Sequence, residues 1–401
     1  MDGNHVKREP RGLSARSPAA RVVQLLSDLI AIPSVNVHPI QSDECNPEAG
    51  MIEYLTGYLA PLGCDIELRD VRAGRKNLFA RLKGRDRTRT LALEAHTDTV
   101  GVQGMTIPPH EPKIEANRIY GRGSCDTKGS LAAFLEAFRR VAESGELPPW
   151  DVLLLATMGE ETGCEGAAAL AAQGFKADAC LVGEATFCKP MIAHKGSIWF
   201  KITTQGQTAH GSTPHLGINA IYRMRHVLNA LESLVPQRLA AVKDPLLGSP
   251  TLSCGIIRGG EKPNVVPGQC TIQLDGRVLP GTDPQKFMND VLLWVRSAAG
   301  DAAGPLTAHS MEQSPAFQIA PEHPFVKTVL AASRKLLGDQ AAPIGGAFFS
   351  DAGPLSAAGT PCIVFGPGDI AKAHAPDEFL DLTELTRAAD IAEDIIRTIG
   401  A

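Results

Sequence analysis

Two adjacent carboxylates, Glu160 and Glu161, stand where a buried strand is expected to end. They follow the apolar run at residues 152–156, which has the length and composition of a strand buried on both faces. Like charges this close suppress each other's ionisation unless a cation lies beside them. Taken alone, the pair fits a solvated loop edge better than a metal site, and it is the rest of the chain that favours a metal.

Further acidic and imidazole side chains follow other predicted strands. His96 and Asp98 end an apolar segment, and residues two apart on an extended strand face the same way. A glycine-rich loop presents Asp126, and another short apolar segment ends at Glu184. Because ligands of open α/β sheets bind at the carboxyl ends of the strands, we expect these side chains to lie together.

The types of donor atom favour a divalent cation. A second imidazole, His374, follows a late predicted strand and turn at residues 361–368. Imidazole nitrogen suits zinc, cobalt or manganese, and carboxylate oxygen suits the same ions when two metals share a bridging ligand. Each residue alone is as easily a surface side chain, but their repetition at successive strand ends predicts a metal site.

The elements that must position these residues alternate between strands and helices. Besides the strands, amphipathic patterns predict helices at residues 19–32, 46–62, 130–143, 166–173 and 325–337. Asn46 is a candidate N-cap of the second helix and Gly63 is its stop. Alternation of this kind is typical of an α/β domain.

A segment in which the predicted strands and helices follow a different order interrupts that pattern. Its predicted elements are strands at 197–204, 251–257, 271–278 and 306–311, with helices at 219–235 and 284–298. The order strand–helix–strand–strand–helix–strand fits a small α+β domain. We therefore expect a metal-binding catalytic domain at 18–192 and 314–401, an inserted domain at 193–313, and a disordered tail at 1–17.

Composition argues against several classes of function. The chain of 401 residues has a formal net charge of -5, no basic stripe and 5% aromatic residues, which does not suit a nucleic-acid partner. Its 9 cysteines are scattered without a C-x-x-C pair, as expected of reduced thiols. No secretory signal pattern and no apolar run of membrane-span length occur. We expect a cytoplasmic protein with no membrane partner.

Short motifs occur in order from about residue 20 to the end of the chain. They are Glu-Ala-His96-Thr-Asp98-Thr-Val, Gly-Arg-Gly-Ser-Cys-Asp126-Thr-Lys-Gly, Gly-Glu160-Glu161-Thr-Gly, Val-Gly-Glu184-Ala-Thr, Ala-His-Lys195-Gly196, Gly-Gln-Thr-Ala-His210-Gly-Ser-Thr-Pro, Lys-Pro-Asn264-Val-Val-Pro-Gly, Asp-Gly-Arg277-Val-Leu-Pro-Gly and Gly-Pro-Gly-Asp-Ile-Ala-Lys-Ala-His374-Ala-Pro-Asp-Glu-Phe. In these motifs the chain resembles the M20 family of metallopeptidases, in its branch of acetylornithine deacetylases and succinyl-diaminopimelate desuccinylases.

The resemblance implies a fold and a cofactor. The fold is a zinc-peptidase-like α/β/α catalytic domain with an inserted ferredoxin-like domain that serves as a lid and pairs two subunits into a homodimer. The cofactor is a pair of divalent ions, zinc before cobalt or manganese. The implied ligands are His96, Asp126 and Glu184 for one ion, and Asp126, Glu161 and His374 for the other, with Asp126 bridging.

The resemblance also implies roles for residues off the metals. Asp98 would orient a metal-binding imidazole, and Glu160 would be the general base that passes a water proton to the leaving amine. His210 would donate to the oxyanion in the active site of the partner subunit. Asn264 and Arg277 would bind the substrate carboxylate. Without the resemblance, the favoured interpretation is that Asn264 is a turn residue and that Arg277 forms a structural ion pair.

The activity implied is hydrolysis of the amide of a small N-acyl amino acid, as in the acetylornithine deacetylation of arginine biosynthesis. The Ala-His-Lys-Gly segment and the His374 segment resemble that branch more than the desuccinylase branch. Residues 344–351 keep the Gly-Gly and Ser-Asp of desuccinylases with bulk inserted between them, and lack the Thr-Glu pair of the other branch. A succinyl-diaminopimelate desuccinylase, a broader N-acyl-amino-acid hydrolase, and a dipeptidase or carboxypeptidase stay open. A non-catalytic binding protein would be expected to have lost a ligand or Glu160.

Overall fold

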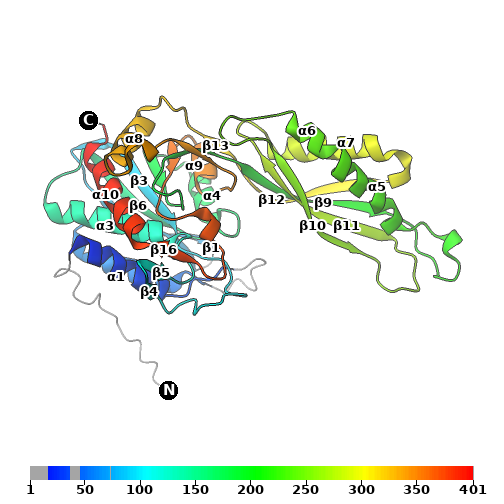
Figure 1. The fold of residues 1–401 in the computed structure, drawn as a ribbon, viewed down its shortest axis with the longest axis horizontal. Coiled ribbons are helices and arrows are strands. Elements are labelled where there is room, and N and C mark those ends of the chain that lie inside the picture. Colours follow the sequence, from blue (N-terminus) through cyan, green and yellow to red (C-terminus); the bar gives the residue numbers. More distant parts are fainter. Residues whose placement is uncertain (1–16, 37–45, 73, 401) are drawn as a thin grey trace, which may run out of the picture. The chain divides into compact units, whose positions relative to one another are not determined.

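A computed structural model describes residues 17–36, 46–72 and 74–400, so residues 1–16 of the predicted tail lie outside the described residues. The chain divides into two compact units (Figure 1). The first comprises the chain up to Ile192 together with Ile319–Ile344 and Ser350–Ala401, and the second comprises Ala193–Gln318 and Gly345–Phe349.

A mixed β-sheet forms the centre of the first unit. Its strands follow the order β1-β2-β6-β3-β7-β15 and are β1 Asp65–Arg72, β2 Arg75–Leu82, β6 Trp150–Thr157, β3 Asp86–His96, β7 Ala179–Val182 and β15 Cys362–Val364. Strands β6, β3, β7 and β15 run parallel, while β2 pairs antiparallel with both β1 and β6. Met191, at the start of β8 (Met191–His194), pairs with Val364 of β15. A small separate sheet holds β4 Lys113–Glu115, β5 Arg118–Tyr120 and β16 Phe379–Asp381.

Helices surround that sheet. They are α1 Pro18–Ile30, α2 Ala49–Leu59, α3 Lys128–Ser144, α4 Glu165–Ala172, α8 Pro324–Leu337, α9 Ala352–Ala357 and α10 Leu382–Thr398. Helices α1, α3, α8 and α10 pack against one another, and α4 packs against α9 (Figure 1). Strands β6 and β7 are buried almost throughout, as expected of strands covered on both faces. The predicted α/β architecture is confirmed. Among the described helices, none combines the length and the apolar character needed to cross a membrane.

The second predicted helix begins later than expected. Helix α2 starts at Ala49 with Glu48 in the N-cap position, and no side chain caps it. Asn46 instead donates its side-chain N–H to the carbonyl of Gly74, so the prediction that Asn46 caps this helix is wrong. Gly63, with φ of 68°, does end the short 3-10 turn that follows α2, because the left-handed conformation suits a residue without Cβ.

The second unit is a four-stranded antiparallel sheet with helices on one face. Its elements are β9 Gly196–Gln205, α5 Ala220–Ser233, α6 Val235–Ala240, β10 Thr251–Gly259, β11 Gln269–Val278, α7 Pro284–Ala299, β12 Leu306–Ser314 and the two-residue β13 Phe317–Gln318; β14 Ile344–Gly346 crosses the division between the units. The sheet order β10-β11-β9-β12 with this βαββαβ sequence is the ferredoxin-like arrangement. Strand β11 alternates between buried and half-buried positions, which indicates one face on the core of α5 and α7.

One buried ion pair fixes the loop before α3. Glu378 is fully buried and accepts hydrogen bonds from the backbone N–H groups of Gly123, Cys125 and Asp126, at 3.2, 2.9 and 3.1 Å. Its Oε2 also lies 2.6 Å from Nη1 of Arg122. The carboxylate therefore holds the loop in place through backbone donors and balances a guanidinium that has little access to water.

Loss of that carboxylate is expected to destabilise the first unit. Glu378→Ala leaves Arg122 buried without its partner, which typically costs about 3–5 kcal/mol of unfolding free energy. Denaturant unfolding should show this as a lower midpoint with an unchanged slope. Glu115→Ala, which removes an exposed ion pair with Lys113, is the control and should leave the midpoint where it is. Equal midpoints for wild type and Glu378→Ala would contradict this account of the loop.

Candidate active site

The predicted site residues of the first unit follow parallel strands that end at one edge of the sheet. His96 ends β3 beside Thr157 of β6, and Val182 of β7 lies beside Val364 of β15. Because these strands point the same way, the loops after them emerge together. Those loops carry Glu160, Glu161, Glu184 and His374.

Asp126 lies between two imidazoles, those of His96 and His374, that are far apart in the sequence. Its Oδ1 is 3.2 Å from Nε2 of His96, and its Oδ2 is 3.1 Å from Nε2 of His374. The two oxygens of one carboxylate therefore face two different ring nitrogens. This is the disposition required of a ligand that bridges two metal ions.

Two glutamates complete the cluster around Asp126, one beside each imidazole. Oε2 of Glu161 lies 3.3 Å from Nε2 of His374, and Oε1 of Glu184 lies 3.7 Å from Nε2 of His96. One donor atom from each of His96, Asp126 and Glu161 falls within 4.8 Å of the others. The structure thus brings together all five residues expected to bind metal.

Asp98 joins the imidazole of His96 to the loop of the adjacent glutamates. Nδ1 of His96 lies 3.3 Å from Oδ1 of Asp98 and 3.0 Å from its carbonyl oxygen, which leaves Nε2 facing the carboxylate cluster. The backbone N–H groups of Glu160 and Glu161 each donate to Asp98 at 3.2 Å. The fully buried Asp98 therefore fixes both the ring and the loop.

Sequence reasoning missed two buried residues that support this cluster. Asn36 donates its side-chain N–H to Oδ2 of Asp98 at 2.9 Å. Glu378 accepts the backbone N–H of Asp126. Glu378 stands inside the His374 motif, where a carboxylate four residues from an imidazole was a usable signal. Asn36 has no pattern around it that would have singled it out.

The electrostatics of the cluster call for more positive charge. Burial and the neighbouring charge of Asp126 raise the pKa of Glu161 to about 7. Burial, followed by the charge of Asp126, also raises the pKa of Glu184 well above its usual range. Burial opposes the ionisation of Asp126 as well, but the hydrogen bonds from His374 and His96 hold the pKa of Asp126 below its usual range.

A pair of divalent cations fits this donor set. Carboxylates buried side by side ionise only when a cation compensates them. Nitrogen and oxygen donors in this combination are those of zinc and of similar borderline metals. His96 presents its Nε2 while Asp98 occupies its Nδ1, which is the usual arrangement of a metal-binding histidine.

The remaining candidates lie in the second unit, at two ends of its sheet. Exposed His210 bonds Ser212 through its ring at 2.7 Å, and the turn holds Asn264 close, since Gly211 donates to the Asn264 carbonyl at 2.7 Å. Arg277 pairs with Asp275 at the other end of β11. Arg277 is eight residue steps beyond Gln269, where β11 begins. At about 3.3 Å per residue, this is roughly 26 Å. One chain therefore does not bring Asn264 and Arg277 together.

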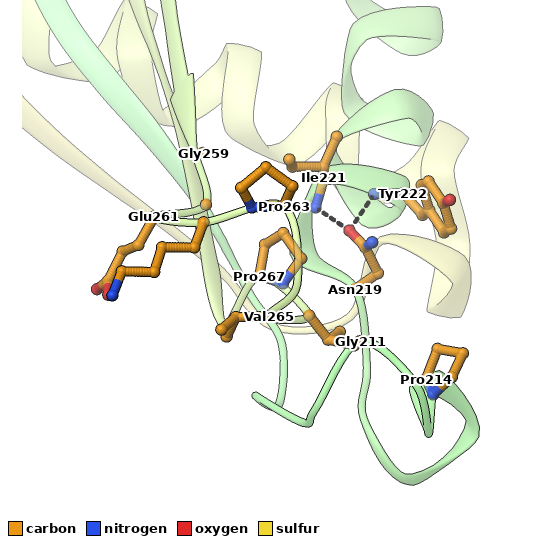
Figure 2. Close-up of a pocket in the computed structure, with 13 residues that line it drawn as sticks. Gly211, Pro214, Asn219, Ile221, Tyr222, Gly259, Glu261, Pro263, Val265 and Pro267 are labelled. Atoms are coloured by element: carbon orange, nitrogen blue, oxygen red, sulfur yellow. Dashed lines mark hydrogen bonds between the residues drawn. The ribbon is translucent and has the colours of Figure 1, made fainter.

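A pocket of about 560 Å³ adjoins the His210 turn (Figure 2). Gly211 and Val265 line it on one side, and Ile221 and Tyr222 at the start of α5 line it on another. Asn219 caps this helix by accepting from the N–H groups of both Ile221 and Tyr222. The pocket is thus built partly from apolar side chains that remain exposed in the single chain.

Comparison with known proteins gives relatives that span almost the whole chain. It is 32% identical over 375 residues to an acetylornithine deacetylase of Vibrio vulnificus, covering 92% of this chain and 96% of that protein. It is likewise 32% identical over 384 residues to an acetylornithine deacetylase of Proteus mirabilis, covering 93% and 95%.

Solved structures match the fold at lower identity. A tripeptidase from Staphylococcus aureus superimposes with a TM-score of 0.77 at 22% identity, covering 94% of this chain and 98% of that one. A dinuclear metal binding peptidase of the M20 family from Bacillus subtilis gives a TM-score of 0.70 at 17% identity, covering 94% and 98%. Residues 92–398 also match the family model of peptidase family M20/M25/M40. The chain therefore belongs to this family and is a hydrolase that acts on amide bonds.

Proposed function

We propose that the protein is a two-metal deacylase that hydrolyses the amide of N-acyl amino acids, with N-acetylornithine as the first candidate substrate. The observation that carries the proposal is Asp126, whose two oxygens face two imidazoles. The acetylornithine deacetylase relatives favour the acetyl group and ornithine over the succinyl-diaminopimelate and dipeptide alternatives. A cytoplasmic location agrees with this metabolic role.

Five residues would hold the two ions, which we take to be zinc. One set is His96, Asp126 and Glu184, and the other is Asp126, Glu161 and His374. Bound there, the ions would lower the pKa of a water and polarise the amide carbonyl. The domain that contains these ligands, residues 18–192 and 314–401, would be catalytic.

Glu160 is the group that would move protons. It is only 6% exposed and is not among the five ligands. Burial, together with the charges of Glu184 and Glu161, raises the pKa of Glu160 well above its usual range, although His96 opposes the shift. Glu160 would take a proton from the attacking water and deliver it to the leaving amine.

The inserted domain, residues 193–313, would act as a lid and pair two subunits. Its outer strand β10 is exposed along most of its length, and Ile257 is 53% exposed on it. Tyr222 of α5 is 71% exposed. Unpaired edge strands and apolar patches of this kind mark surfaces that join another chain. A homodimer formed there would let His210 and Asn264 serve the partner's site, with Arg277 serving its own.

The substrate proposal is tested on a panel of N-acetylornithine, N-succinyl-diaminopimelate, other N-acyl amino acids and free-amine dipeptides. N-acetylornithine should give the highest kcat/KM. A chelator should abolish turnover, and added zinc or cobalt should restore it. A preference for dipeptides would replace the substrate assignment while keeping the metals, whereas turnover that resists chelation would refute the mechanism itself.

The adjacent glutamates should separate by metal content. Glu160→Ala should lower kcat by about 10²–10⁴-fold and keep both ions, because its role is proton transfer. Glu161→Ala should reduce the occupancy of one ion. Metal analysis of the two purified variants checks this, with Glu165→Ala, a nearby glutamate on helix α4, as the control. Equal metal loss in the Glu160 and Glu161 variants would contradict the division of roles.

His210 is tested by mixing subunits. His210→Ala alone should lower turnover by about 10²–10³-fold, as for loss of one oxyanion donor, while metal content and dimerisation stay normal. A heterodimer of one His210→Ala and one Glu160→Ala subunit contains one site with both defects and one with neither. It should therefore regain about half of the wild-type activity. A heterodimer as inactive as its parents, with subunit exchange proven, would exclude action across the interface.

A further inference from the structure

The thiol of Cys164 lies beside the carboxylate of Glu160. Its Sγ is 3.8 Å from Oε1 of Glu160, within hydrogen-bond reach for sulfur. Cys164 is 1% exposed, so water does not compete at this position. The contact engages Oε1 and leaves the other oxygen of the carboxylate, Oε2, outside it.

The backbone of Cys164 adopts an unfavourable conformation that directs its thiol towards Glu160. Cys164 has φ of 57°, the left-handed region that is unfavourable for a residue with a Cβ atom. The N–H groups of Gly163 and Cys164 both donate to the carbonyl of Glu160 at 3.0 Å, so the turn closes on itself. A glycine would relieve the strain but would remove the side chain that reaches back to Glu160.

We propose that Cys164 is a positioning residue for Glu160: its contact with Oε1 holds the carboxylate in one rotamer, with Oε2 directed to the reacting water. A glutamate side chain has three rotatable bonds, and a general base must lie within hydrogen-bond distance of the proton that it takes. The inference rests on the proposed role of Glu160 and adds the group that keeps it in place.

The test compares Cys164→Ala, which removes the donor, with Cys164→Ser, which keeps one. Cys164→Ala should lower kcat about tenfold, a part of the full general-base contribution, and change KM less than about twofold. Cys164→Ser should fall between this variant and the wild type. Bound metal should be unchanged in both. Crystal structures should show Glu160 in more than one rotamer in Cys164→Ala and in one rotamer in Cys164→Ser.

Cys188→Ala is the matched control. Cys188 is also fully buried, has φ of 58°, and makes its sulfur contact at 3.5 Å with the carbonyl of Glu384 instead of with Glu160. Its loss should leave kcat unchanged. The proposal is overturned if Cys164→Ala keeps full kcat, if Cys164→Ser is no better than Cys164→Ala, or if Cys188→Ala loses as much.

Failure of this inference is distinct from failure of the proposed function. If Glu160→Ala is inactive while Cys164→Ala is fully active, Glu160 remains the base and only its positioning by Cys164 is refuted. If Glu160→Ala retains turnover, the general-base assignment falls, and the rotamer comparison alone then reports on the contact.

Discussion

The burial of four carboxylates at one edge of a sheet is the constraint on which the site depends. Asp126, Glu160 and Glu184 are 8%, 6% and 4% exposed, and the side chain of Glu161 is 7% exposed. The imidazoles of His96 and His374 lie against three of them, Asp126, Glu161 and Glu184. Burying several ionised carboxylates this close together destabilises the folded chain unless cations bind beside them. The buried carboxylates and the two imidazoles are therefore best understood as a set of ligands for metal ions.

Backbone donors make the arrangement rigid. The N–H of Val100 donates to Oε1 of Glu161, and the N–H groups of the glutamate loop donate to Asp98. Glu378 holds the Asp126 loop in the same manner. Acids outside the cluster thus position the acids within it through main-chain contacts, which vary less than contacts between flexible side chains.

Much of the first unit could be predicted because parallel strands impose a simple geometry. Once β3, β6 and β7 were expected as buried strands, the residues after them had to meet at one edge, and His96, Glu161 and Glu184 do. Long-range partners were harder. Asn36 contacts Asp98 from an irregular segment, where neither periodicity nor spacing carries information about the contact.

Local rules failed where a tertiary contact competed with them. Asn46 has a side chain that commonly caps helices. Here that side chain donates to the carbonyl of Gly74 instead, and α2 starts three residues after Asn46. In the second unit, the sequence motifs did not predict how far apart Asn264 and Arg277 lie in space. Asn264 lies in the turn before β11, whereas Arg277 lies near the far end of that extended strand, so the two motifs are held apart.

The central claim is that Asp126 bridges two metal ions, and anomalous diffraction at the zinc edge of crystals grown with zinc tests it most directly. The account predicts two anomalous peaks, one beside Nε2 of His96 and one beside Nε2 of His374, with a different oxygen of Asp126 bound to each. A single peak, or two peaks of which one lies away from Asp126, would contradict it.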